Sequence, residues 1–357
     1  MNPYIYLRGL RHADHTVFNV AEGQKRYWDE QFQKYVAYCS GQHVKRSVLE
    51  EMTTNLGEQP APITFYFEKE KTDQKGKSSV KEKEVTSPGD PRFADQLLGG
   101  WMIANAGGNK RTIKRRSPLS ISALRALHPL LSNIAEENLS FDRSDRPELH
   151  KVIVTDEKGN ELSEEEIAEL LKGSDRSLRR KWIQGNRRTS GLFVYDVAID
   201  LRTLFCVSTN ELEPELSIET IEALKNDGWT QSKNVFGTCL VAPKERRENL
   251  IPSIAKSLIN WRITTNQART FSPMEILAVA ISQDANKITG SIRAKLNLEG
   301  EKPLAKPIVD DSIPDVDTFV TLSGAGYFDT QSESHEAIEK AEEKLIELIS
   351  SFPYEQQ

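Results

Sequence analysis

The stretch Ser40-Gly41-Gln42-His43-Val44-Lys45-Arg46-Ser47 decides how the chain around it is expected to fold. Ser40 is a preferred helix N-cap, because its hydroxyl accepts a hydrogen bond from a backbone N–H that the first turn leaves unpaired. Val44, Val48 and Met52 then recur every four residues. This spacing predicts a helix that turns one apolar face toward a core.

The other face of this helix is basic. Gln42, Lys45, Arg46 and Leu49 share it by helical spacing, and the free N–H groups of a helix N-terminus favour an anion. These residues suit a phosphate backbone. An ordinary amphipathic helix with a solvated basic face explains the same local pattern, so the rest of the chain has to decide between the two.

An apolar strand near the N-terminus, followed by S-x-Q-x-x-K-R at the start of a helix, resembles the backbone subunit of Cascade-type CRISPR effector complexes. That subunit is the seventh of the numbered Cas proteins, in the RAMP superfamily. Asp95–Met102 is similar to the D-x-x-L-F-G-x-M stretch of the family's helical insertion, although Gly99 stands where the family favours an aromatic residue. Gly191–Leu204 resembles the family strand that returns to the central sheet.

The resemblance implies an α+β fold. It consists of an RRM-like (ferredoxin-type) palm, a helical finger insertion and a thumb β-hairpin. The palm would be discontinuous, over residues 1–56, 117–135 and 190–357. The finger would take 57–116, with an exposed mobile loop over 68–92, and the thumb would take 136–189.

Composition places the chain among globular proteins. It has 357 residues, of which 38% are hydrophobic and 28% charged, enough for one large or two modest domains. No apolar run approaches the length of a membrane span, and charged residues interrupt the N-terminus where a signal peptide would be apolar. Cys39, Cys206 and Cys239 are too scattered for a metal site. We therefore expect reduced thiols, no membrane and a cytoplasmic location.

The net charge of −6 argues weakly against a nucleic-acid-binding protein, but the charges are segregated. The first basic cluster is formed by Lys110, Arg111, Lys114, Arg115 and Arg116. The second is formed by Arg176, Arg179, Arg180, Lys181, Arg187 and Arg188, together with Trp182, whose ring suits stacking on a base or packing on the thumb. A solubilising surface explains each cluster alone. With Gln42, His43, Lys45 and Arg46, they become the candidate RNA-binding residues.

The remaining segments are assigned from periodicity and from turn residues. Strands are expected over 4–8, 63–67, 151–155, 191–204, 274–282, 287–296 and 318–322. Helices are expected from Ser40 to Gly57, over 95–102, from Ser163 to Gly173, over 217–227 and 249–261, and near the C-terminus. Residues 24–39 and 117–126 suit either a helix or a strand.

Catalytic patterns are few. The sequence holds no Walker loop, nucleophile elbow or zincin motif. His12 and His15 flank Asp14 and could bind a metal, but a polar turn is the preferred interpretation because no third ligand lies nearby in sequence. Asp142, Asp145 and Asp156 lie where RNA-cleaving members of the superfamily carry an acidic residue. We expect no catalytic residue, no metal and no cofactor.

By resemblance, the chain is expected to be a non-enzymatic subunit that binds the guide RNA (crRNA) of an antiviral ribonucleoprotein. Its expected partners are the guide, target DNA paired to the guide, head-to-tail copies of itself and other Cascade subunits. A metal-dependent RNA endonuclease of the same superfamily is the first alternative. A general single-strand RNA-binding protein is the second.

Overall fold

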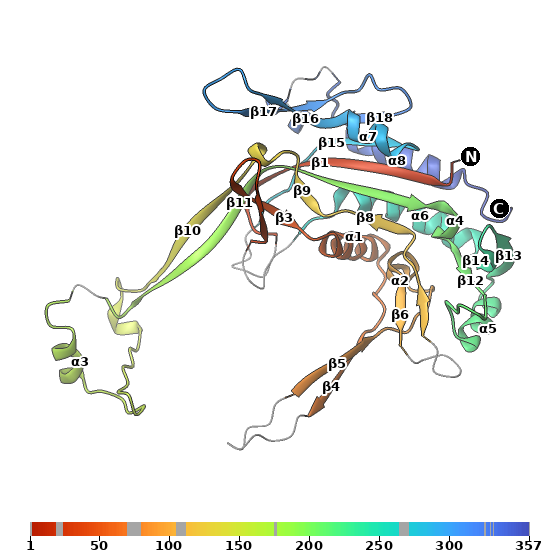
Figure 1. The fold of residues 1–357 in the computed structure, drawn as a ribbon. Coiled ribbons are helices and arrows are strands. Elements are labelled where there is room, and N and C mark those ends of the chain that lie inside the picture. The colour runs from red at the N-terminus through yellow and green to blue at the C-terminus, as the bar shows by residue number, and fades with distance from the viewer. Residues whose placement is uncertain are drawn as a thin grey trace.

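The computed structural model describes residues 2–18, 24–69, 80–104, 112–174, 177–263, 271–324, 326–328, 330 and 332–356, with the side chains of 137–139, 147, 182–186 and 323 left aside. Within these residues the fold is a mixed α+β arrangement of antiparallel sheets. A central body carries long hairpins that project away from it (Figure 1). The finer expectation of an RRM-like palm stays a prediction, as do the predicted domain boundaries.

The largest sheet in the described part of the chain has nine strands. They are β1 (Tyr4–Thr16), β2 (Arg26–Asp29), β3 (Lys34–Cys39), β8 (Leu119–Ile121), β9 (Leu124–Ala126), β10 (Ser132–Asp142), β11 (Arg180–Asp200), β15 (Ile276–Ser282) and β18 (Asp317–Val320). The order is β18-β15-β1-β11-β9-β3-β2, and β8 and β10 also pair with β11. The pairs are antiparallel, so hairpins and longer connections on the surface link the strands.

Helices and smaller sheets surround this sheet. The helices are α1 (Gly41–Leu56), α2 (Ala94–Gly99), α3 (Glu164–Leu170), α4 (Leu201–Leu204), α5 (Ile218–Asn226), α6 (Lys244–Asn260), α7 (Ala285–Ser291) and α8 (Ala337–Ser350). The small sheets pair β4 (Thr64–Lys69) with β5 (Val80–Thr86), β6 (Trp101–Ile103) with β7 (Ile113–Arg115), β14 (Gly237–Val241) with both β12 (Cys206–Ser208) and β13 (Thr230–Asn234), and β16 (Ile292–Asn297) with β17 (Leu304–Val309). Among the described helices, none is long and apolar enough to cross a membrane.

Helix α1 confirms the predicted caps. Ser40 lies in the extended region, and its side chain accepts a hydrogen bond from the His43 backbone N–H. Gly57 ends the helix with φ of 67°, a left-handed conformation that favours glycine. A Cβ on Gly41 would lie 2.7 Å from the Ile121 carbonyl oxygen, so only glycine lets the helix start this close to β8.

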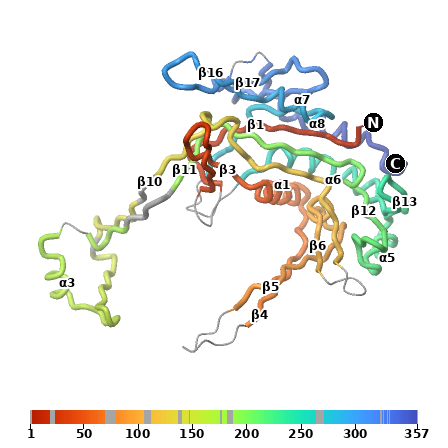
Figure 2. Tube along the Cα trace, viewed as in Figure 1, coloured from red at the N-terminus to blue at the C-terminus, as the bar shows by residue number. Residues whose placement is uncertain are grey.

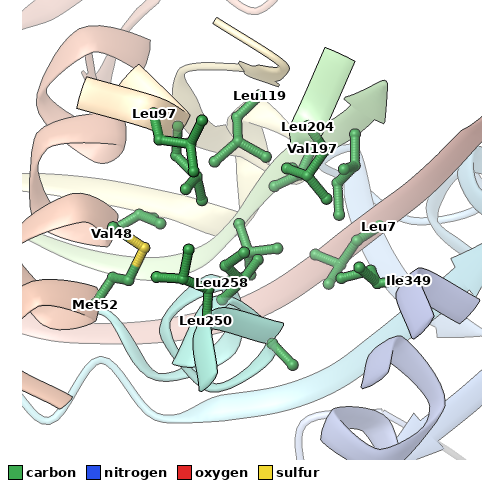
Figure 3. Packing of buried hydrophobic residues seen from close by; sticks show 14 of the residues in the cluster. Leu7, Val48, Met52, Leu97, Leu119, Val197, Leu204, Leu250, Leu258 and Ile349 are labelled. Carbon is green, nitrogen blue, oxygen red and sulfur yellow. The ribbon is translucent and has the colours of Figure 1, made fainter. Parts of the chain in front are cut away.

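The main core lies between the sheet and the helices α1, α6 and α8. Figure 3 shows Val48 and Met52 of α1 among side chains from α6, β1 and β11. Val44, Val48 and Met52 are each at most 1% exposed, which confirms the predicted apolar face. Full burial of three such side chains is worth about 1.5–3 kcal/mol each, so this face fixes the position of α1.

Strand β11 is buried on both faces where it crosses the sheet. Phe193, Tyr195, Val197 and Ile199 share one face and join the main core, as their two-residue spacing predicts. Val194, on the opposite face, joins a second core under α7 and β16. This strand is consequently the centre of the fold.

The thumb segment is a long hairpin of β10 and β11 that leaves the body and carries α3 at its far end (Figure 2). β11 is one uninterrupted strand of 21 residues, running from the thumb into the central sheet. Gly191 marks the point where the strand enters the body, with φ of 137°. A Cβ there would lie 2.3 Å from the Leu131 carbonyl oxygen, so glycine is required for this close approach.

Three expectations about local structure are wrong. The mobile loop over 68–92 is partly a hairpin, because β5 pairs with β4 and places Val85 opposite Phe65. Residues 287–296 are half helix, since the Asp284 carboxylate caps α7 and delays the strand to 292. Residues 151–155 form an isolated bridge, Thr155 to Glu161, rather than a strand.

The segments left open between helix and strand are now assigned. Residues 24–39 hold β2 and β3, and 117–126 hold β8 and β9. The predicted helix over 249–261 belongs to α6, which begins five residues earlier, at Lys244. The predicted acidic helix after Ser163 is confirmed, with a full capping box between Ser163 and Glu166.

Candidate nucleic-acid interface

The first turn of α1 presents two exposed polar side chains. Gln42 and Arg46 point to solvent, and the Arg46 side chain is 77% exposed. The Arg46 Nε lies 2.7 Å from Glu50 Oε1, an ion pair at i,i+4. Exposed pairs of this kind are worth about 0.3–0.5 kcal/mol, so a phosphate can readily displace the carboxylate. Both side chains are accessible on the face that helical spacing assigns to them, and their contact with RNA stays a prediction.

His43 is half-buried beside them. Burial, followed by the charge of Arg46, lowers the pKa of its imidazole. A lowered pKa means that the ring is neutral near pH 7. His43 can therefore donate one hydrogen bond to a ligand but adds no charge to the site.

Lys45 corrects the expectation of an exposed cation. Its side chain is partly buried, and its Nζ donates a hydrogen bond of 3.1 Å to the Gly99 carbonyl oxygen at the end of α2. Burial, and then the positive charge of Arg115, lower the pKa of Lys45 to about 8. Lys45 thus joins α1 to α2, because the position that helical spacing assigns to the surface is covered by the 57–116 segment.

The depressed pKa of Lys45 predicts a pH-dependent stability. In the unfolded chain the amine titrates near its ordinary value of about 10.4, so between about pH 8 and 10.4 the unfolded state holds more protons. The free energy of unfolding should therefore rise with pH across this window and lose that gain as pH falls through 8. Urea denaturation at a series of pH values gives the free energy of unfolding of the wild type and of Lys45→Met. The difference between the two isolates the contribution of the Lys45 amine, because the other groups titrate equally in both proteins. If the free energy of unfolding changes with pH in the same way in both proteins, the prediction is wrong.

The first basic cluster divides between core and surface. Lys110 and Arg111 lie outside the described residues. Lys114 and Arg116 are exposed on β7 and beside it, at the rim of a cleft of about 690 Å³ that also contains Arg202 and Phe236.

Arg115, in contrast, is 4% exposed. Its guanidinium donates to the carbonyl oxygens of Leu97, Thr203 and Cys206. The prediction that Arg115 contacts RNA is wrong, because alternation along β7 turns this one side chain into the core.

The second basic cluster is spread along the thumb. Arg180, at the outer end of β11, donates from Nε to Asp142 Oδ2 at 2.6 Å. Arg187, near the body, donates to Glu136 Oε1 at 2.9 Å. Lys181 is exposed and Arg179 is partly exposed, while Arg176 and the Trp182 side chain lie outside the described residues. Arg188 is only 5% exposed, so its predicted contact with RNA is wrong: it faces the body where β11 enters the sheet.

The structure does not gather these residues into one cavity. α1 and the β6–β7 hairpin lie together on the body, whereas Arg180 and Lys181 lie far out on the thumb (Figure 1). Arg187 sits at the thumb's root, on the way between the two. The accessible candidates therefore form a discontinuous path rather than a pocket, an arrangement that suits an extended ligand.

Three exposed aromatic residues beside this path are not among the residues that the sequence predicts. Tyr27, Trp28 and Tyr35, on the β2–β3 hairpin, are 42%, 41% and 45% exposed. Tyr27 and Val36 fit a helical face, which hid the alternating pattern of two short strands. The dense aromatic content of residues 27–38 was the available signal.

The histidine and acidic candidates do not form a metal site. His12 Nδ1 lies 2.9 Å from Glu275 Oε1 and 3.0 Å from the Tyr327 hydroxyl. His15 lies near the end of β1, at an irregularity in the pairing with β11, with φ of 44°. Across the described ranges, no group of three or more His, Cys, Asp or Glu side chains could hold a metal ion.

Asp142 and Asp145 line a hollow of about 540 Å³ on the thumb, together with His150. Hydrogen bonds from Ser144, and then from Arg180, lower the pKa of Asp142 to about 2. Asp156 lies elsewhere, in a turn where its carboxylate accepts from the Asn160 amide. The three predicted acids are thus not gathered at one point.

Comparison with known proteins gives structural likeness alone. No family model matches the chain, and no curated protein matches its sequence. One similar solved structure is a chain of a "CRISPR RNA-guided surveillance complex, pre-nicking", with a TM-score of 0.45 and 10% identity, covering 78% of this chain and 77% of that one. Another, from a "CRISPR RNA-guided surveillance complex", has a TM-score of 0.37 and 9% identity, covering 98% and 85%. The likeness concerns the course of the backbone and identifies no subunit.

Proposed function

We propose that the chain is a non-enzymatic backbone subunit of a CRISPR interference complex. It binds guide RNA, polymerises along it head to tail, and presents the guide for pairing with target DNA. The observation that carries the proposal is the thumb: a long hairpin that leaves the body and exposes apolar side chains far from any core of its own.

The exposed apolar side chains of the thumb suit contact with a second copy of the chain. Phe141, Leu149, Ile153 and Leu170 on the thumb are between 53% and 65% exposed. An isolated two-stranded hairpin is marginally stable in water, and clusters of exposed apolar residues usually mark interaction sites. These residues become buried if the thumb rests on a neighbouring subunit.

A surface for that contact exists elsewhere on the chain. The β4–β5 hairpin also projects from the body, and its Phe65, Tyr66 and Phe67 are 62%, 52% and 58% exposed. Two different apolar surfaces on one chain allow a head-to-tail contact, which is open-ended and continues along a polymer. The length of the bound RNA would then set the number of subunits.

The polar candidates suit the RNA itself. Gln42, Arg46, Lys114, Arg116 and Lys181 all reach solvent. Lys and Arg contacts to phosphates position a strand without reading its sequence, as a subunit that holds guides of any sequence requires. The overall charge of −6 does not oppose this, because local cations dominate contact with a polyanion.

Assembly should follow RNA length. Purified chain mixed with single-stranded RNAs of increasing length, and of unrelated sequence, is expected to form complexes that grow by one subunit for each added increment of RNA. Native mass spectrometry or sedimentation velocity gives the stoichiometry directly. One copy per RNA, whatever the length, would overturn the proposal. Sequencing of copurifying RNA then separates a guide-specific subunit from a general single-strand RNA-binding protein.

A metal-dependent endonuclease is the second candidate. Asp142, Asp145 and His150 line one hollow on the thumb, although in the described structure they form no group that could hold a metal ion. Regular cuts in RNA paired to the bound guide, dependent on Mg²⁺ and lost in Asp142→Asn, would support this candidate. Intact RNA under the same conditions supports the non-enzymatic subunit.

A further inference from the structure

The β2–β3 hairpin forms an edge of the central sheet and presents an aromatic pair to solvent. Trp28 and Tyr35 are direct cross-strand partners, with ring centroids 5.0 Å apart in an edge-to-face arrangement. The two side chains remain 41% and 45% exposed. Their partly free ring surfaces lie outside both cores.

The hairpin does not depend on this pair for its anchorage. Val36 and Ala37 of β3 are fully buried, and the Lys34 Nζ donates to the Ser132 carbonyl oxygen at 2.8 Å. Exposed aromatic rings on an already anchored hairpin are therefore available for a ligand.

One cation lies against the aromatic pair. The Arg26 guanidinium carbon lies 3.8 Å from the centre of the Tyr35 ring. Arg26 also approaches Glu136 at 4.0 Å, and the same carboxylate accepts from Arg187 at 2.9 Å. Two guanidinium groups share one carboxylate, which leaves a positive charge beside the rings. A polyanion with flat, apolar bases complements this surface.

The position of the hairpin links the accessible candidates. β3 leads directly into Ser40 and the first turn of α1, where Gln42 and Arg46 reach solvent. On its other side the hairpin abuts the root of the thumb, through Lys34 and Arg26 (Figure 1). A strand that follows the chain from α1 to the root of the thumb would run along the hairpin that carries the aromatic pair.

We propose that Trp28 and Tyr35 form a base-stacking platform for single-stranded RNA, with Arg26 fixing the Tyr35 ring and Arg187 adding positive charge. This inference rests on the proposed function and adds to it the place where bases, rather than phosphates, contact the chain. Stacking on aromatic rings is tolerant of sequence, since every base has a flat face. A subunit that accepts guides of any sequence could use it without losing generality.

The test is a double-mutant cycle between protein and RNA. Binding of a fluorescein-labelled single-stranded RNA is compared with binding of a strand of the same length that carries abasic sites, for the wild type and for Trp28→Ala/Tyr35→Ala. We expect the double variant to lose about tenfold or more in affinity for normal RNA, on the scale of one or two lost stacks. It should bind the abasic strand as the wild type does.

Matched variants separate stacking from other effects. Trp28→Phe/Tyr35→Phe keeps the rings and should restore most of the affinity, which excludes a folding defect as the cause. Phe271→Ala, which removes an exposed ring that lies outside the hairpin, should not alter the difference between the two strands. Arg46→Ala should weaken binding of both strands equally, because phosphates are present in each.

The outcomes are distinct. If the wild type binds no single-stranded RNA, the proposed function fails and the platform with it. If the wild type binds but the double alanine variant binds normal RNA equally well, only the platform is overturned. If the variant instead loses self-association in the absence of RNA, measured by sedimentation, the hairpin edge pairs with protein and the platform is again overturned.

Discussion

Val48→Asp is expected to unfold the chain or to lower its stability by about 3–5 kcal/mol, the cost of an uncompensated charge in a core. Val48 is 1% exposed and lies among Leu97, Leu250 and Leu258 (Figure 3). These neighbouring side chains are apolar and give a carboxylate neither a hydrogen bond nor an ion pair. Chemical denaturation followed by circular dichroism measures the loss before any RNA is added.

A matched aspartate on the exposed side of the same helix isolates burial as the cause. Thr54→Asp introduces the same group near the end of α1, where Thr54 is exposed. Its cost should stay at about 1 kcal/mol or less, the level of an unfavourable helix-terminus charge on a surface. Equal losses for the two variants would contradict the packing of α1 described above.

Shortening the thumb should abolish assembly while leaving the body folded. Replacing residues 144–178 with Asn-Gly closes β10 and β11 by a two-residue turn, since the Arg143 N–H already donates to the Arg179 carbonyl oxygen at 3.0 Å. The removed part includes α3 and three of the exposed apolar side chains. RNA-dependent polymerisation should weaken by a factor on the order of one hundred or more, because interface anchors are worth about 2 kcal/mol or more each.

Native mass spectrometry with a long RNA is the direct measurement, and thermal melting checks the body. Leu149→Ala/Leu170→Ala is the milder form and should weaken assembly in the same direction. Leu212→Ala/Leu298→Ala removes two leucines that are 76% and 71% exposed but lie off the thumb. This control should assemble normally. Full-length polymers of the shortened chain would remove the main support for the proposed function.

Local signals in the sequence predicted the elements that local physics controls. The caps of α1 and α3 and the alternation of Phe193, Tyr195, Val197 and Ile199 each depend on neighbours within a few residues. The sequence does not decide between a helix and the β2–β3 hairpin for residues 24–39, since strands this short fit both the helical and the strand spacing of apolar residues. α7 was misread because apolar residues on both sides of Asp284 suggested continuous strands.

The candidate site was predicted less well than the fold. Charge counting selects Arg115 and Lys45 as readily as Arg46, yet the first two are covered by segments distant in sequence. Their burial depends on how the 57–116 segment packs on α1 and on β12, which no local pattern encodes. Arg188 shows the same limit, because its neighbour Arg187 remains accessible on the same strand.

The continuity of β11 limits how relatives of this chain can vary in length. Since β11 belongs to the thumb and to the sheet core at once, an insertion of one residue in its outer half would either reverse the outward and inward faces of everything beyond it or force a bulge. The pairing already shifts once, between Glu137 and Leu139, so length could change without a further bulge only in steps of two residues, matched in β10. The length of the hairpin could therefore differ between relatives only by such paired steps.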